Sequence, residues 1–125
     1  MKILLAAASV LLLSTSAFAA DLNAELTTAA THAGLAAKAT DIMGVHMHMH
    51  HAINCLEGAK GADYDATNAN PCAKSGNGAI PDASGAQKAK LQMALTSANA
   101  GLASTDLAAA QKDAADAGAA IDGAK

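Results

Sequence analysis

The chain has 125 residues, about the length of one domain, with 52% hydrophobic residues and a formal net charge of −3. A mildly acidic balance argues against nucleic acid binding, which needs a basic face. Tryptophan is missing, and large apolar side chains are sparse among many alanines, each of which buries little area on folding. A core this lean needs a covalent link, a ligand or a partner subunit.

Residues 1–19 show the order of features that is typical of a secretory signal peptide. Lys2 supplies the positive charge, an apolar run follows from Ile3 to Leu13, and Ala17 to Ala19 fit the small-x-small cleavage rule. The run is shorter than the about 20 residues of a membrane span, and a retained N-terminal anchor is the alternative. We expect export to a bacterial periplasm, with residues 20–125 as a single domain that does not insert stably into a membrane.

The stretch from residue 21 to residue 57 carries apolar residues at helical spacing and contains no proline. Asp21 is a candidate N-cap. The apolar stripe changes face at Gly34, where a helix can end because glycine adopts the left-handed conformation readily. We therefore predict two helices, 21–33 and 35–57. One long helix that changes partners midway is the alternative.

Residues 58–81 are rich in glycine, asparagine, aspartate and proline, and this composition predicts a loop. The run 63–68 resembles half of a calcium loop. It lacks the central glycine and the closing glutamate of an EF-hand, so we expect a turn with side-chain caps instead.

The two cysteines, Cys55 and Cys72, flank most of this loop. In an exported protein an even pair of cysteines predicts a disulfide. A pair of thiolate metal ligands is the alternative, although the spacing matches no compact C-x-x-C site. The disulfide would stabilise the fold by about 3 kcal/mol by constraining the unfolded chain.

Residues 82–101 form the next predicted helix, capped by Asp82 or Ser84 and ended by Gly101, and the last helix starts at Ser104 or Thr105. Short connections imply antiparallel neighbours. The expected fold class is therefore all-α, a small antiparallel helical bundle of three to four helices with one disulfide-stapled loop.

Four of the five histidines lie in one run of six residues, from His46 to His51, where methionines alternate with them. On a helix, residues four apart are neighbours on one surface. Three such pairs occur: His46 with His50, Met43 with Met47, and Met47 with His51. Imidazole and thioether groups would therefore converge on one patch. The candidate metal ligands are His46, Met47, His50, His51 and Met43.

This mixture of donors favours copper. Imidazole binds zinc, copper, nickel and iron, whereas thioether is soft and selects Cu(I). Zinc sites favour histidine with cysteine or carboxylate, and no acidic residue lies within the run. We predict a copper ion, with zinc or nickel as alternatives. A single helix face rarely closes a coordination sphere, so a homodimer that joins two clusters is a further prediction.

The remaining donors have simpler interpretations. Met49 falls on the predicted core face of its helix. His48 points to the opposite side, near Cys55, where we expect it to be solvated or to contact a ligand rather than bind the metal. His32 lies beyond the predicted break and is interpreted as a partly exposed helix histidine.

The segments 50–58, 70–72 and 76–79 carry a pattern that can be written H-H-x-x-N-C-L…N-P-C…G-x-G. It covers about a third of the chain after the signal peptide and resembles a group of small exported bacterial proteins of uncharacterised function. The resemblance implies that the histidines, the cysteines and the loop form one unit. It implies no particular activity.

These observations predict a periplasmic metal-binding protein that buffers, delivers or senses copper. The alternative is a structural or interaction module of the bacterial envelope that packs on a protein partner, with histidines that are incidental or respond to pH. A b-type haem protein is a minor alternative, because helical bundles hold haem through histidine and methionine, but a chain with so few aromatic residues makes a poor haem pocket. No nucleophile, base and acid are arranged for catalysis, so we expect no enzyme.

Overall fold

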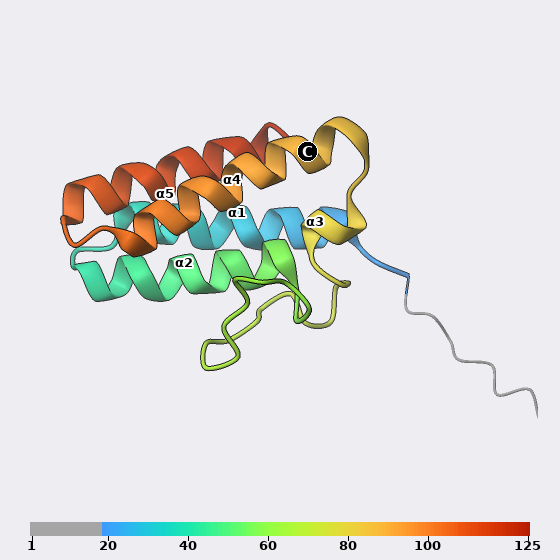
Figure 1. Ribbon diagram of the computed structural model, residues 1–125, viewed down its shortest axis with the longest axis horizontal. Coiled ribbons are helices and arrows are strands. Elements are labelled where there is room, and N and C mark those ends of the chain that lie inside the picture. Colours follow the sequence, from blue (N-terminus) through green and yellow to red (C-terminus); the bar gives the residue numbers. More distant parts are fainter. Residues whose placement is uncertain (1–18) are drawn as a thin grey trace, which may run out of the picture.

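The computed structural model describes residues 19–125 (Figure 1), so the predicted signal peptide lies outside the described residues except for its last position. All the secondary structure of residues 19–125 is helical, which confirms the predicted all-α class. Within this range there are five helices: α1 (Leu22–Lys38), α2 (Ile42–Glu57), α3 (Ala79–Asp82), α4 (Gly85–Ala103) and α5 (Leu107–Asp122).

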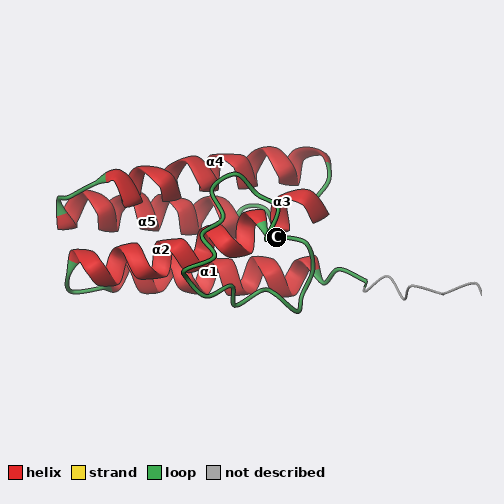
Figure 2. Cartoon of the chain, turned by 60° about the horizontal axis from the view of Figure 1, so that its bottom comes forward, coloured by secondary structure: helices red, strands yellow, loops and turns green. Residues whose placement is uncertain are grey.

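The four long helices run alternately up and down the long axis of the molecule (Figure 1). Helices α1 and α2 form one layer, and α4 and α5 form the other (Figure 2). The layers meet where α1 packs on α5 and α2 packs on α4, while the short helix α3 contacts α1, α2 and α4. In the part of the chain that the structure describes, no helix is both long and apolar enough to cross a membrane.

The core between the two layers is rich in alanine. Its largest apolar side chains with no exposed surface are Met49, Ile53, Leu56, Leu91 and Ile121. On α1 and α5, most of the buried positions are alanines: Ala29, Ala33, Ala36, Ala110, Ala114 and Ala117. The distance between packed helices depends on the side chains at the contact, so methyl groups at these positions allow close approach.

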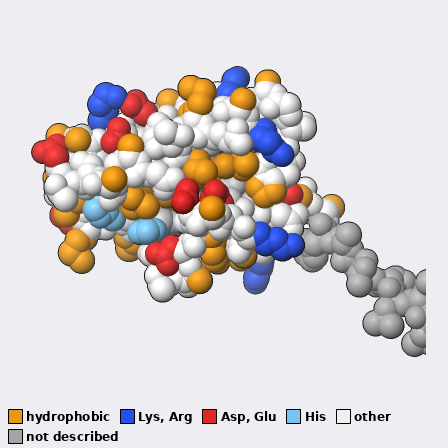
Figure 3. Space-filling model, in the orientation of Figure 1, with side chains coloured by type: hydrophobic (Ala, Val, Ile, Leu, Met, Phe, Trp, Pro, Cys, Tyr) orange, Lys and Arg blue, Asp and Glu red, His pale blue; other side chains and the backbone are white. Residues whose placement is uncertain are grey.

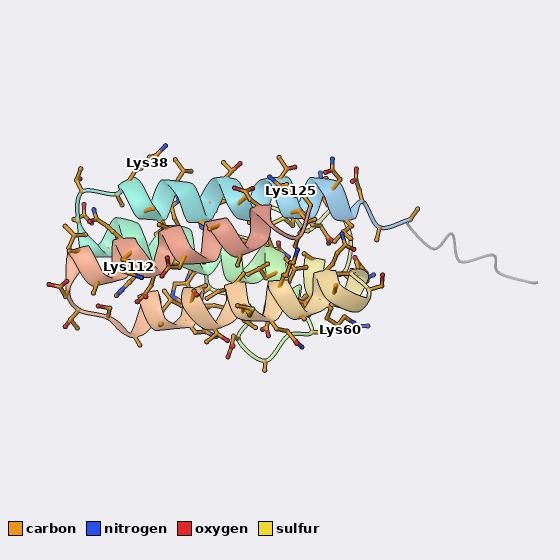
Figure 4. The ribbon with its side chains drawn as sticks, turned by 90° about the horizontal axis from the view of Figure 1, so that it is seen from above. Lys38, Lys60, Lys112 and Lys125 are labelled. Atoms are coloured by element: carbon orange, nitrogen blue, oxygen red, sulfur yellow. A yellow bond between two sulfur atoms is a disulfide. The ribbon has the colours of Figure 1, made fainter. Side chains whose placement is uncertain are left out.

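The predicted helix break at Gly34 is wrong, and so is the alternative of one continuous helix. Helix α1 passes through Gly34 and ends at Lys38, a basic residue in the last turn that points away from the helices (Figure 4). The turn lies instead at Ala39 to Asp41, where the Asp41 carboxylate accepts a hydrogen bond from the Gly44 N–H at 2.8 Å. A side-chain N-cap is worth about 1 kcal/mol, comparable to the cost of a glycine inside a helix.

Other predicted helix ends are confirmed or corrected by their caps. Asp21 caps α1, as expected, by accepting a hydrogen bond from the Ala24 N–H at 2.9 Å. Ser84 occupies the N-cap position of α4. Helix α4 does not end at Gly101 but continues to Ala103. Gly101 is buried against α5, where an added Cβ would lie 3.4 Å from the Ala110 carbonyl oxygen. Helix α5 is capped by Asp106 rather than by Ser104 or Thr105.

The segment between α2 and α3 is a loop, and its cysteine pair is bonded. A disulfide joins Cys55 to Cys72, as predicted, and both residues are buried in the core. The loop ends at residue 78 rather than at the predicted residue 81, because residues 79–82 form α3. Gly58 and Gly78 have positive φ angles and pass so close that a Cβ on Gly58 would lie 1.8 Å from the Asn77 carbonyl oxygen.

Polar side chains hold this loop in place. The buried Asn54 amide donates hydrogen bonds to the carbonyl oxygens of Asp65 and Ala69 and accepts one from the Asp65 N–H. The Asp65 carboxylate accepts from the N–H and hydroxyl of Thr67 and from the Asn68 amide. These bonds hold the pKa of Asp65 at about 2, with the Thr67 hydroxyl as the largest cause. The expected turn with side-chain caps at residues 63–68 is confirmed.

Candidate metal centre

Three histidines from two helices meet on one side of the α1–α2 hairpin. His32 comes from α1, and His48 and His51 come from α2, one turn apart. Each offers a ring nitrogen such that the three nitrogens lie within 4.8 Å of one another. The rings of His32 and His51 have centroids 4.9 Å apart, and those of His48 and His51 have centroids 5.9 Å apart. We call these three residues the histidine triad.

The spacing of the triad suits a single ion. The Nδ1 atoms of His32 and His48 are 3.4 Å apart. Two imidazole nitrogens bound to one tetrahedral zinc or similar ion at 2.0–2.1 Å would be about 3.3 Å apart. These two atoms therefore already stand at the separation of two ligands of one ion. His51 offers the third ring nitrogen, within 4.8 Å of those from the other two histidines.

The hairpin explains why these histidines meet. His32 and His48 are equally far along the chain from Thr40, which lies at the centre of the turn between α1 and α2. Both helices rise by the same 1.5 Å per residue, so two residues at equal distance from the turn lie at the same level in an antiparallel pair. His51 follows His48 by three residues and therefore occupies the same face of α2 one turn further on.

Burial disfavours the protonated form of two triad imidazoles, His32 and His51. It lowers the pKa of His32, and the neighbouring His51 and His48 lower it further. It also lowers the pKa of His51, with additional effects of His48 and His50. The neutral ring is the form that binds a metal ion. All three side chains are half-buried, so an ion from solvent can still reach them.

One ring nitrogen of the triad lacks any partner. His51 Nδ1 is buried and has no hydrogen-bond partner among the described residues. A buried polar group without a partner costs about 1–3 kcal/mol. A metal ion bound to this nitrogen would supply the missing partner and offset this cost.

Of the five ligands predicted from the sequence, the structure brings only His51 into the triad. His46 lies elsewhere: its Nε2 is 3.0 Å from the Ser104 carbonyl oxygen at the α4–α5 connection. A carbonyl oxygen only accepts, so this His46 nitrogen carries the proton and donates. His50 Nδ1 lies 3.5 Å from Asp65 Oδ2, against the loop.

The two predicted thioether ligands lie on the surface of α2. Met43 is 79% exposed and Met47 is 46% exposed. Histidine side chains gather over α2 beside apolar and acidic ones (Figure 3). The predicted core role of Met49 is confirmed, since this side chain is fully buried.

The structure gives His32 and His48 a contact with each other that was not predicted from the sequence. His32 is half-buried, as expected, but it faces α2 rather than standing alone. His48 turns toward α1 instead of lying free in solvent. His32 and His48 were not predicted to meet because a helix break was expected at Gly34. With the turn at residues 39–41, the equal distance of His32 and His48 from Thr40 would have been a usable signal.

The triad is a surface cluster and not a deep pocket. A cavity of about 420 Å³ lies elsewhere, in the loop, lined by Ala73, Lys74, Gly76 and Asn77. None of these residues belongs to the triad or to the set of ligands predicted from the sequence.

Comparison of this chain with protein-family models, with curated proteins and with solved structures finds no match. The resemblance to small exported bacterial proteins therefore stays a prediction. What the protein does has to be inferred from the geometry of the triad.

Proposed function

We propose that this protein is a periplasmic metal-binding protein that holds a copper ion on His32, His48 and His51. The observation that carries the proposal is the convergence of three imidazole nitrogens from two helices, within 4.8 Å of one another. The apolar N-terminal run and the disulfide support export to an oxidising compartment.

A metal ion gives this cluster a physical reason to exist. Three imidazoles at this distance repel one another when protonated, and the neighbouring rings lower the pKa of His32 and His51. Neutral imidazoles have ring nitrogens with free lone pairs that need a donor or an ion. The only hydrogen-bond-range contact between triad rings in the described chain is the one of 3.4 Å between His32 and His48.

Copper is the ion that this donor set favours. The triad offers imidazole nitrogen and no carboxylate, and affinity for divalent ions at nitrogen sites is highest for copper, ahead of nickel and zinc. Zinc is the nearest competitor, because three histidines with an open fourth position also form zinc sites. A half-buried site with three protein ligands leaves the ion exchangeable, which suits buffering or delivery.

The test is a metal titration of the purified protein with its disulfide oxidised. Cu(II), Cu(I), Zn(II) and Ni(II) are offered against calibrated competing chelators. We expect one copper ion per chain, held more tightly than zinc or nickel. Alanine at any one triad position should lower copper affinity by more than the about 10–100-fold that loss of an outer hydrogen-bond partner costs a metal site.

The chain offers a matched control for this test. The double variant His46→Ala, His50→Ala removes two histidines of the same helix that lie outside the triad. It should keep the copper affinity of the original protein. Loss of binding in this control together with retention in the triad variants would reject the triad and restore the ligand set predicted from the sequence.

A second candidate function is that of an interaction module of the bacterial envelope. It is favoured by large apolar side chains on the surface, with Leu35 44%, Met43 79% and Met93 66% exposed. This candidate predicts a stable complex with an envelope protein or a second copy, which crosslinking and light scattering would reveal. A protein that stays monomeric and captures no partner would count against it.

A further inference from the structure

Helix α2 carries a row of donor side chains that ends at the triad. Met43, Met47 and His51 follow one another at intervals of four residues, so they are neighbours along one face. Side chains on a helix lean toward its N-terminus. The His51 ring therefore leans toward the turn that carries Met47, and the Met47 side chain leans toward the turn that carries Met43.

Packing does not explain this row. Met43 and Met47 are 79% and 46% exposed, whereas Met49 on the same helix is fully buried in the core. A single exposed apolar residue needs no explanation. Two methionines at one-turn intervals place two sulfur atoms on the face of α2 that carries His51, with Met47 one turn and Met43 two turns from this triad member.

Thioether sulfur has the properties that the fourth position requires. It is a soft ligand that selects Cu(I) over zinc and nickel. Methionine has three rotatable bonds, so its sulfur can reach an ion without any movement of the backbone. Met47 is also half-exposed, so little packing is lost when the side chain turns toward the triad.

We propose that Met47 supplies the fourth ligand of a Cu(I) ion held by the histidine triad, and that Met43 is the first sulfur an incoming ion meets. This inference rests on the proposed function. It assigns the oxidation state, Cu(I), and a path along α2 by which the ion reaches the triad or leaves it for another carrier.

The equilibrium test compares Met47→Leu with Met93→Leu. Leucine keeps the apolar bulk and the helix propensity of methionine, and Met93 is a more exposed methionine on α4 that lies outside the row. Cu(I) affinity is measured anaerobically against a chromophoric Cu(I) chelator, and Zn(II) affinity is measured in parallel. Because Met47 would bind the ion directly, Met47→Leu should weaken Cu(I) binding by at least the about 10–100-fold that loss of an outer hydrogen-bond partner costs a metal site, and it should leave Zn(II) binding unchanged. Met93→Leu should change neither.

Spectroscopy gives an independent reading of the same ligand. X-ray absorption of the Cu(I)-loaded protein should contain a copper–sulfur shell together with nitrogen shells. The sulfur shell should vanish in Met47→Leu and persist in Met93→Leu. A site with nitrogen shells alone in the original protein would overturn the assignment of Met47.

The kinetic test addresses Met43. Met43→Leu should keep the equilibrium affinity for Cu(I) but slow the transfer of Cu(I) from the chelator, as followed by stopped-flow absorbance. Transfer at the original rate would overturn the path along α2.

Failure of this inference can be told apart from failure of the proposed function. If Met47→Leu binds Cu(I) as the original protein does while His32→Ala loses it, the fourth-ligand assignment is wrong and the triad stands. If His32→Ala, His48→Ala and His51→Ala all keep the original affinity for every metal, the proposed function itself is wrong.

Discussion

The loop between α2 and α3 and the hairpin of α1 and α2 both take polar side chains out of water, and they provide for them differently. In the loop, Asn54 has backbone partners on both ends of its amide. In the hairpin, three imidazoles lie next to one another, and His51 Nδ1 has no hydrogen-bond partner among the described residues. The loop network is satisfied within the fold, whereas the triad brings together three like groups that a metal ion would satisfy.

The comparison predicts its largest effect at Asn54. Asn54→Ala should lower the free energy of unfolding by about 4 kcal/mol, because the buried amide loses its hydrogen bonds to half-buried and exposed backbone groups of the loop, each worth about 0.5–1.5 kcal/mol. Urea denaturation measures this change. Asn99→Ala, which removes one exposed hydrogen bond to Asp63, is the control and should cost less than about 1 kcal/mol. An equal loss in both variants would show that the Asn54 network is not special.

The disulfide provides the next effect. The double variant Cys55→Ser, Cys72→Ser should lose about 3 kcal/mol of stability, because the unfolded chain is no longer constrained. The bond ties the loop and not the triad, so copper affinity below the unfolding transition should be unchanged. A parallel fall in affinity would mean that the loop covers the metal site.

Glu25 makes stability depend on pH. Its side chain is fully buried, with Oε1 accepting from the Gly78 N–H at 2.9 Å and Oε2 unpartnered in the described chain. Burial, which outweighs the opposing effect of that bond, raises the pKa of Glu25 from 4.5 to about 7, with further increases from Asp82 and Asp21.

The sign follows from proton binding. The folded state holds the Glu25 proton more tightly than the unfolded state does. The contribution of Glu25 to stability is therefore largest below about pH 4.5 and is lost as the pH rises through 7. The expected loss is about 2–3 kcal/mol, measured by urea denaturation across this range. Glu25→Gln mimics the protonated acid and should flatten the profile. An unchanged profile would assign the dependence to another group.

The smallest effect is expected at the triad without metal. His48→Ala should change the stability of the metal-free protein by less than about 1 kcal/mol, since the triad rings lack the matched partners that stabilise a fold. Copper at about 100 times its dissociation constant should stabilise the original protein by about 2.7 kcal/mol, and His48→Ala should lose this gain. Thermal denaturation with and without copper measures both. A large loss without metal would make the triad a structural cluster.

Local signals predicted much of the fold. Asp21 as a cap, the Cys55–Cys72 pair and the turn at residues 63–68 all depend on residues near one another or on simple pairing rules. The hairpin turn was missed because Gly34 was the stronger local signal for a break, although Asp41 had the chemistry of a cap. A helix tolerates one glycine when tertiary packing favours its continuation.

The candidate metal centre was predicted only in part. The density of histidines in α2 identified the right helix, and His51 is common to the predicted ligands and the triad. His32 could not be found from spacing within α2, because it belongs to another helix and meets the triad only through the hairpin. Likewise, nothing local showed that His46 would bond to Ser104 or that His50 would face Asp65.

The alanines buried on α1 affect how the metal preference of such a site can evolve. An alanine side chain cannot change its rotamer, so alanines at a helix contact fix the distance between the packed helices. The triad takes His32 from α1 and His48 and His51 from α2, so the distance between these two helices sets the distance between their histidines. One added carbon at Ala33, which lies opposite Gly118 of α5, would press α1 away from α5 and so shift His32 relative to His48 and His51, with every ligand left in place.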